Sequence, residues 1–250
     1  HTPIRRQRQM CIRDRSPRYA IYVVPDDNAL FQRASRWLGW DCVAVEALDP
    51  PSKDDLDNQT DLDIRAVSAT PRKYGFHGTI KPPFSLAEGV DEAMLFDQAQ
   101  KLASSLEPIA LNGLEIRAIG GFLALVPQAT STALNDLAAC FVTDLDHCRQ
   151  PANSAELARR RAAGLTPRQE EMLVAWGYPY VLDEFRFHLT LSGRLDEDKI
   201  ATARDMLSEW IGPVVPNPFR IDRLALVEEG DDGRFRLGQW LPLGAEKPDC

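Results

Sequence analysis

Residues 74–84 read YGFHGTIKPPF, and residues 185–193 read FRFHLTLSG. In each stretch a histidine is followed two residues later by a threonine, within a run of β-forming side chains. Such runs favour β-strands, and we expect Pro82-Pro83 to close the first strand and Gly193 to end the second. One H-x-T pattern carries little information, but two in similar surroundings indicate a repeated unit.

The segments after the two motifs also repeat in the same order. Each motif is followed by a helical spacing of apolar residues and then by two strands joined at a glycine-containing turn. Leu114 and Leu224 lie at nearly the same distance after His77 and His188. The expected elements are a helix over 91–106 and strands over 109–119 and 122–126 after the first motif, and a helix over 196–210 and strands over 219–227 and 235–241 after the second.

The rest of the chain is assigned by the same patterns. We expect a first strand over 18–24, and a helix over 29–38 capped by Asp26 or Asp27 and stopped by Gly39. Residues 50–63 are polar and predict a loop. The segment between the repeats predicts helices over 134–147 and 155–164 and a third that begins after Thr166-Pro167.

These elements predict one domain over residues 17–243. It contains motif-bearing repeats at about 70–127 and 183–241 and a helical bridging segment at 130–182. Residues 1–16 carry five arginines and little apolar content, so we interpret them as a disordered or non-native tail, or alternatively as a basic arm for an anionic partner. Residues 244–250 predict a frayed end.

The composition narrows the class of protein. Apolar residues at 44% and charged residues at 26% exclude a wholly disordered chain and a fibrous protein. No apolar run is long enough for a transmembrane helix, so we expect no membrane partner. A net charge of -8 favours a small anionic ligand over long nucleic acid, although a local basic pocket is allowed. Five cysteines without a C-x-x-C pair indicate a reducing, cytoplasmic location.

The spacing of the motifs predicts two polar strand faces. Residues i and i+2 of a strand point the same way, so each histidine shares a face with its threonine, while the alternate apolar residues anchor the strand to a core. The polar faces would line a cleft. They comprise His77, Thr79 and Lys81 in the first strand, and Arg186, His188, Thr190 and Ser192 in the second.

Two imidazoles on opposite walls of a cleft can act as general base and general acid near neutral pH. Threonine hydroxyls can donate hydrogen bonds to phosphate oxygens, and Lys81 or a nearby arginine can neutralise developing charge. Alternatively, each histidine is a hydrogen-bonded strand residue. A zinc site would need a third ligand, which no motif supplies, so we expect neither a metal nor another cofactor. His147 is interpreted as structural.

Aromatic and basic residues near the motif strands are further candidates. Tyr74 and Tyr178 could stack on a base or sugar, or belong to the core or rim. Arg159, Arg160 and Arg161 could reach an anionic substrate or form a solvated helix face. The sequence contains no G-x-x-x-x-G-K-[ST], G-x-G-x-x-G, G-x-S-x-G or H-E-x-x-H motif.

Two H-x-T-hydrophobic motifs, one in each half of a repeat, resemble the 2H phosphoesterase superfamily, which includes LigT-like RNA 2′,3′-cyclic phosphodiesterases. The contexts RKYGFHGTIKPPFSL, WGYPYV and FRFHLTLSG resemble the branch encoded in bacterial phosphonate-utilisation operons. The likeness covers about residues 18–243. It implies an α+β fold with two pseudo-symmetric antiparallel sheet/helix lobes around a central cleft. It also implies an acid/base pair of His77 and His188, with Thr79 and Thr190 binding phosphate.

The resulting prediction is a metal-independent cyclic phosphodiesterase that acts on a small sugar or nucleotide phosphate in phosphonate metabolism. Lys81, Tyr74, Arg186 and Tyr178 are the further predicted substrate contacts. One alternative is action on short RNA ends, and another is a non-catalytic nucleotide-binding module of a phosphonate-pathway assembly. The sequence decides neither which histidine is the base nor which proteins are partners.

Overall fold

The computed structural model of the chain describes residues 17–25, 28–56 and 62–244. The arginine-rich segment 1–16 and the predicted caps Asp26 and Asp27 lie outside these residues. The first helix is capped by Asn28, whose side chain accepts a hydrogen bond from the Phe31 amide. Gly39 ends this helix in the left-handed conformation, as the sequence predicts.

A seven-stranded sheet with the order β11-β10-β1-β4-β8-β7-β6 forms the framework, and its strand pairs are antiparallel. Two small sheets, β2-β3 and β5-β9, accompany it. The strands are β1 (Arg18–Val23), β2 (Trp40–Asp41), β3 (Glu46–Ala47), β4 (Gly78–Ser85), β5 (Ile109–Leu111), β6 (Leu114–Ile119), β7 (Phe122–Pro127), β8 (Leu189–Thr190), β9 (Phe219–Ile221), β10 (Arg223–Glu229) and β11 (Phe235–Pro242).

Six of the eight helices in the described residues agree with the predicted helices to within a few residues at each end, whereas the short helices α2 and α3 were not predicted. Their buried faces carry the predicted apolar side chains, such as Leu95 and Ala99, although Met94 on the same helix is exposed. The helices are α1 (Ala29–Leu38), α2 (Ile64–Val67), α3 (Ala69–Arg72), α4 (Glu92–Ser104), α5 (Thr132–Asp144), α6 (Ser154–Arg161), α7 (Pro167–Trp176) and α8 (Glu197–Trp210). None of the helices in the described part of the chain is long and apolar enough to cross a membrane.

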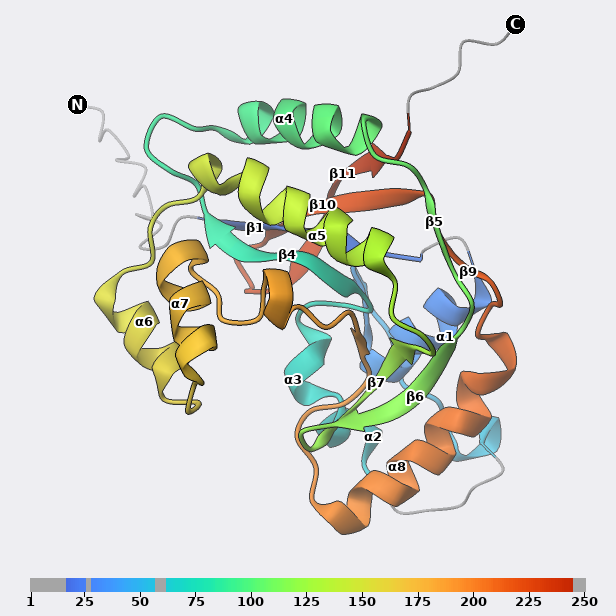
Figure 1. The fold of residues 1–250 in the computed structure, drawn as a ribbon. Coiled ribbons are helices and arrows are strands. Elements are labelled where there is room, and N and C mark those ends of the chain that lie inside the picture. Colours follow the sequence, from blue (N-terminus) through green and yellow to red (C-terminus); the bar gives the residue numbers. More distant parts are fainter. Residues whose placement is uncertain (1–16, 26–27, 57–61, 245–250) are drawn as a thin grey trace, which may run out of the picture.

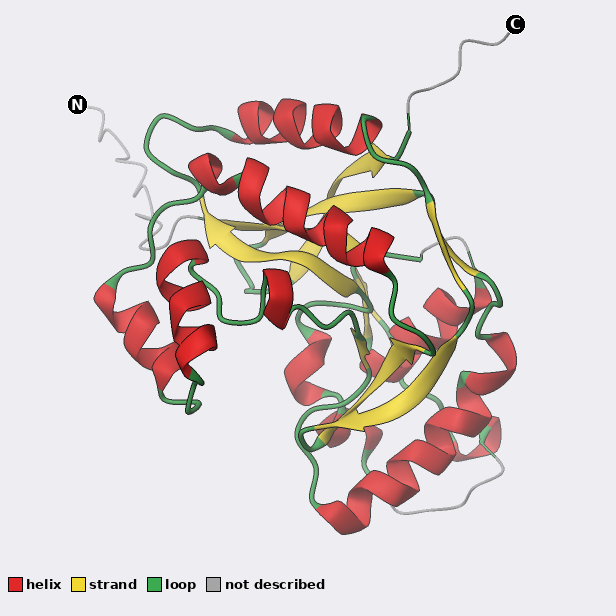
Figure 2. Cartoon of the chain, viewed as in Figure 1, coloured by secondary structure: helices red, strands yellow, loops and turns green. Residues whose placement is uncertain are grey.

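The framework divides into two lobes (Figures 1 and 2). Strands β11, β10, β1 and β4 form one lobe with α4 and α5, and strands β8, β7 and β6 form the other with α8. The α6–α7 hairpin projects beside the first lobe in Figure 1. The predicted α+β class, with two antiparallel lobes, is confirmed.

The two halves of the sequence exchange their hairpins. The β6–β7 hairpin follows the first motif along the chain but pairs with β8, the strand of the second motif. The β10–β11 hairpin follows the second motif but pairs with β1, which lies next to β4. The repeat therefore describes the order of elements along the chain, and each lobe is built from both halves.

The extent of the two motif strands differs from the sequence prediction. β4 continues through Pro82-Pro83 to Ser85, and β8 ends at Thr190 rather than at Gly193. Proline lacks an amide donor and is tolerated at strand edges and bulges. Here β4 pairs with β8 only at Gly78, so within the described residues the prolines have a sheet neighbour on one side alone, at an irregular stretch of the β1 ladder.

A β-bulge changes the position of Lys81. Tyr22 pairs with Thr79, and the adjacent Ile21 pairs with Lys81, so two residues of β4 oppose one residue of β1. Strict alternation is thereby lost, and Lys81 does not share the cleft-facing side of Thr79. The Lys81 side chain is 3% exposed, and its Nζ donates a 3.0 Å hydrogen bond to the carbonyl of Val142 in the last turn of α5.

Gly78 is expected to tolerate no side chain, because a Cβ at this position would lie 2.4 Å from the Phe187 ring. The variant Gly78→Ala must displace this buried ring, and overpacking of this kind costs about 1–3 kcal/mol. Urea unfolding would measure the loss. Gly212→Ala is the control, since a Cβ there meets nothing within 4 Å; equal stability of the two variants would contradict the close packing.

Because of Lys81, the stability of the protein is expected to increase with pH in the alkaline range. Burial lowers the pKa of Lys81 from 10.5 to about 8, with Asp146 and Cys148 opposing and Arg149 adding to the shift. Between these values the unfolded chain binds more protons, so stability rises with pH and the charge penalty is fully present below pH 8. Between pH 8 and 10.5 the unfolding free energy of the wild type should therefore rise by about 2–3 kcal/mol relative to that of the Lys81→Met variant, which has no amine to titrate. Parallel urea-unfolding curves for the two proteins would contradict this.

Candidate active site

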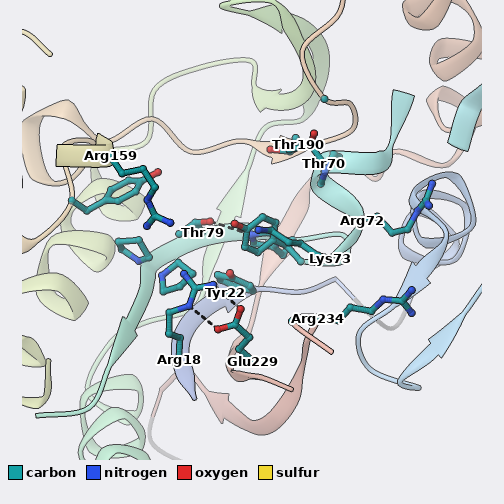
Figure 3. A pocket seen from close by; sticks show the side chains of 18 of the residues that line it. Arg18, Tyr22, Thr70, Arg72, Lys73, Thr79, Arg159, Thr190, Glu229 and Arg234 are labelled. Atoms are coloured by element: carbon teal, nitrogen blue, oxygen red, sulfur yellow. Dashed lines mark hydrogen bonds and ion pairs between the residues drawn. The ribbon is translucent and has the colours of Figure 1, made fainter. Parts of the chain in front are cut away.

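A cleft of about 1240 Å³ lies where the two lobes meet, and all four motif side chains line it. They are His77 and Thr79 at the start of β4, and His188 and Thr190 at β8. Each histidine lies immediately before or at the beginning of its strand rather than in the middle of it. Figure 3 shows the threonines among the basic and aromatic side chains of the walls.

The pairing of β4 with β8 brings the motifs together. The two strands are antiparallel, and Gly78 is the partner of Leu189. Continuing this register by one residue in each direction places His77 opposite Thr190, and His188 opposite Thr79. Because directly opposite residues point to the same face of a sheet, the two motifs interlock as one polar group of four side chains.

Backbone carbonyls orient both imidazole rings in the same way. Nδ1 of His77 lies 3.0 Å from the carbonyl oxygen of Gly75, and Nδ1 of His188 lies 2.7 Å from that of Arg186. A carbonyl can only accept, so each Nδ1 carries the hydrogen and donates it. This leaves Nε2 of each ring for proton transfer. Nε2 of His77 is 3.1 Å from Oγ1 of Thr79, whose hydroxyl donates to it when the ring is neutral.

The surroundings of the two histidines differ. The His77 ring stacks on Tyr22, with the ring centroids 3.7 Å apart. Burial lowers the pKa of His77 to about 4, against the effect of the Gly75 hydrogen bond, and His188 contributes in the same direction as burial. Burial also raises the pKa of Tyr22 well above its ordinary value. His188 instead contacts the ring of Phe122, at 5.6 Å between centroids. At neutral pH the His77 ring is therefore neutral.

The walls of the cleft are basic, although the whole chain is acidic. Seven cationic residues line the cleft against three acidic ones. The cationic residues are Arg18, Arg72, Lys73, Arg159, Arg160, Arg194 and Arg234, and the acidic residues are Glu156, Glu229 and Asp232. The local charge therefore suits an anionic ligand, which the net charge of -8 alone does not indicate.

Several of these cations are held by the protein itself. Arg18 forms a two-point ion pair with Glu229, with both distances at 2.7 Å. Arg160 pairs with Glu156 at 2.9 Å and lies over the Tyr178 ring. Arg72 donates to the backbone carbonyls of α1 and α2 residues and to a serine hydroxyl. These side chains shape the walls, because their hydrogen bonds fix their positions.

The predicted substrate contacts divide into two groups. Tyr74 and Tyr178 line the cleft, and the Tyr74 ring lies 6.0 Å from that of His77. Lys81 and Arg186 do not line it. Lys81 is buried beneath α5, and the Arg186 guanidinium donates to the carbonyls of Asp183 and Phe185. The phosphate-binding role predicted for these two residues therefore has no geometric support.

The other side chains considered from the sequence are placed as follows. The Ser192 hydroxyl accepts a hydrogen bond from the Leu123 amide and donates one to the Gly193 carbonyl, so both of these bonds are to the backbone. Arg161 pairs with Glu170 outside the cleft, whereas Arg159 lines it. Within the described residues, no three His, Cys, Asp or Glu side chains gather into a group that could hold a metal ion.

Sequence reasoning missed several residues of the cleft. Tyr22 and Arg18 come from β1, Thr70 and Lys73 come from α3 and its C-terminal cap, and Arg234 comes from the β10–β11 turn. Arg18 and Tyr22 are separated by an even number of residues in a predicted strand, so they share one of its faces. That signal becomes useful only once β1 is known to be the neighbour of β4.

Two curated relatives named "Ribose 1,5-bisphosphate phosphokinase PhnN" share much of the sequence. The protein from Janthinobacterium sp. (strain Marseille) is 36% identical over 235 residues, covering 92% of this chain and 51% of that protein. The protein from Laribacter hongkongensis (strain HLHK9) is 32% identical over 228 residues, covering 90% of this chain and 52% of that protein. The chain thus spans about half the length of these relatives.

Solved structures with a similar arrangement include E. coli LigT complexed with NADP+, at 12% identity and a TM-score of 0.43, covering 92% of this chain and 99% of that one. A crystal structure of a phosphoesterase has 13% identity and a TM-score of 0.41, with the same coverage. Residues 79–236 match the family described as "Protein of unknown function (DUF1045)". This match spans more than half of the chain, which therefore belongs to that family.

Proposed function

We propose that the chain is a metal-independent phosphoesterase that hydrolyses a cyclic phosphodiester of a small sugar or nucleotide. The observation that carries the proposal is the pairing of Gly78 with Leu189. It interlocks two H-x-T motifs whose histidines both donate Nδ1–H to a backbone carbonyl. Two rings with available Nε2 atoms, two hydroxyls and basic walls are the groups that in-line hydrolysis of a phosphodiester requires.

In the proposed reaction His77 is the general base. Its ring is neutral at pH 7, since its pKa is about 4, so Nε2 can accept a proton from the attacking water. The water oxygen forms a bond to phosphorus as the ester bond on the opposite side breaks. His188 donates a proton from Nε2 to the leaving oxygen, and the products are a phosphomonoester and a free hydroxyl. Solvent then returns both rings to their starting states.

In this scheme the threonines and the basic walls of the cleft stabilise the negative charge of the phosphate. When substrate binds, the Thr79 hydroxyl turns from Nε2 of His77 to a non-bridging oxygen, which also frees Nε2 for the water. Thr190 donates to the non-bridging oxygens as well, where negative charge increases in the transition state. The acidic chain would disfavour a long polyanion, while its basic cleft favours a small one.

The names of the relatives support a ribose phosphate as substrate. The two curated proteins are ribose 1,5-bisphosphate phosphokinases by name, and this chain corresponds to about half of each. The chain lacks the G-x-x-x-x-G-K-[ST] loop that kinases of the P-loop type use to hold nucleotide phosphates. We therefore assign hydrolysis of a ribose cyclic phosphate, rather than the phosphokinase activity, to this chain. Phosphonate metabolism is the proposed setting, in a cytoplasmic enzyme.

His77→Ala and His188→Ala are each expected to lower kcat by about 10²–10⁴, because each removes one proton-transfer group. The measurement is phosphorus NMR with EDTA present, on nucleoside 2′,3′-cyclic monophosphates, a ribose 1,2-cyclic phosphate and an oligonucleotide with a cyclic-phosphate end. His147→Ala is the matched control, since His147 contacts Gln98 and does not line the cleft.

The outcomes of this panel separate the alternatives. Turnover that resists EDTA and is lost in both cleft variants supports the two-histidine mechanism. A preference for the oligonucleotide would move the assignment to RNA ends. Tight binding of a panel member without turnover would favour the non-catalytic binding module.

The acid limb of kcat/KM is expected near pH 4 rather than near 6.5. A general base is inactive when protonated, so activity is lost as pH falls through the pKa of His77. Tyr22→Leu exposes the His77 ring and should move the limb towards 6.5, whereas Tyr22→Phe keeps the stacked ring and should not. Circular dichroism at each pH separates acid unfolding from loss of activity. An acid limb that stays in place in Tyr22→Leu would refute the role of His77 as base.

A further inference from the structure

Within the described residues, four of the seven cleft cations form no ion pair with an acidic side chain, and two of these four, Arg72 and Arg194, instead donate to backbone carbonyls. The other two are Lys73 and Arg234. In the described ranges, no carboxylate lies within ion-pair distance of Lys73 or Arg234, although both line the cleft. The nearby Asp232 accepts from the Arg234 backbone amide and pairs its carboxylate with Arg236 instead. Arg18 and Arg160, by contrast, are neutralised by Glu229 and Glu156. Lys73 and Arg234 thus add uncompensated positive charge to the cleft.

Both cations are supported by aromatic rings. Nζ of Lys73 lies 4.7 Å from the centre of the Tyr74 ring, and the Arg234 guanidinium lies 4.7 Å from that of Trp40. Trp40 is buried and donates its indole N–H to the carbonyl of Phe235, which fixes the ring. Because cations cover these two ring faces, the faces are not free to stack on a nucleobase. An anion is the ligand that the arrangement favours.

A backbone hydrogen bond joins the two segments that carry these cations. The amide of Phe235 donates to the carbonyl of Lys73 at 2.7 Å, so the cap of α3 is tied to the start of β11. The rings of Tyr74 and Phe235 stack at 5.3 Å beside this bond. The cations therefore belong to one supported wall, and little ordering is needed when a ligand binds between them.

This wall lies to one side of the reacting centre. In Figure 3, Lys73 and Arg234 lie to the right of Thr79, and Arg159 lies to its left. Tyr74 follows Lys73 in the sequence, and the centre of its ring is 6.0 Å from that of the His77 ring. A ligand bound by the motifs and by this wall would extend across the Tyr74 ring.

We propose that Lys73 and Arg234 form a second anion subsite, which binds a phosphomonoester carried by the same substrate. This rests on the proposed function, in which the motifs hold a cyclic phosphodiester. The substrate class is then a sugar with a cyclic phosphodiester at one end and a phosphomonoester at the other. The Arg234 guanidinium can donate two parallel hydrogen bonds to the phosphate, and Lys73 supplies a point charge.

The test compares kcat/KM for ribose 1,2-cyclic phosphate with and without a 5-phosphate. The wild type should prefer the 5-phosphorylated substrate by at least about tenfold, chiefly through KM. In Lys73→Met and Arg234→Met the preference should fall towards one. Arg223→Met is the control and should keep the preference, because Arg223 lies over the Trp240 ring in a similar stack but outside the cleft.

The outcomes distinguish the subsite from the reaction. Equal kcat/KM for both substrates in the wild type overturns the subsite and leaves the phosphodiesterase assignment standing. Turnover of neither substrate overturns the assignment, and calorimetric binding of ribose 5-phosphate then decides the subsite. Binding lost in the two variants and kept in Arg223→Met supports it, and binding equal in all proteins overturns it. Preference for a cyclic-phosphate-ended oligonucleotide over both ribose substrates overturns the small-molecule class.

Discussion

The contact between β4 and β8 at Gly78 and Leu189 is the constraint on which the cleft depends. It is a short junction in a wide sheet, and it joins two lobes that are each stabilised by their own helices. The missing side chain of Gly78 lets the Phe187 ring lie directly against the strand. The same close approach sets each histidine against the threonine of the other motif. A packing requirement of the core and the geometry of the cleft are thus met by one pair of residues.

The same junction creates an asymmetry that the repeated sequence hides. Both imidazoles donate Nδ1–H to the carbonyl two residues before them, so their local backbone hydrogen bonds are the same. Their neighbours across the sheet differ, since β1 places Tyr22 on the His77 ring and β7 places Phe122 beside His188. Burial lowers the pKa of His77 and keeps its ring neutral. Different proton-transfer roles can therefore arise from one duplicated motif.

Much of the fold follows from local patterns in the sequence, because caps, apolar spacing and glycine turns act over a few residues. Gly39, Thr166 and the Gly120-Gly121 turn are examples. The motif histidines and threonines were also predicted together, and the cleft contains them. The predicted position of Lys81 on the cleft face was wrong because a β-bulge depends on the partner strand, and the alternation of residues in β4 alone does not reveal it. Arg18, Lys73 and Arg234 were missed because the strand order brings distant segments of the chain to one cleft.

The exchange of hairpins also governs the order in which the lobes can form during synthesis. The lobe of the second motif takes β6 and β7 from the first half and needs nothing beyond α8, so its elements are all present once Trp210 has emerged. The lobe of the first motif begins at β1 yet waits for β10 and β11. Of the two lobes, the one whose first strand comes earlier in the chain is therefore completed last, and until then the outer edge of β1 has no partner strand within this sheet.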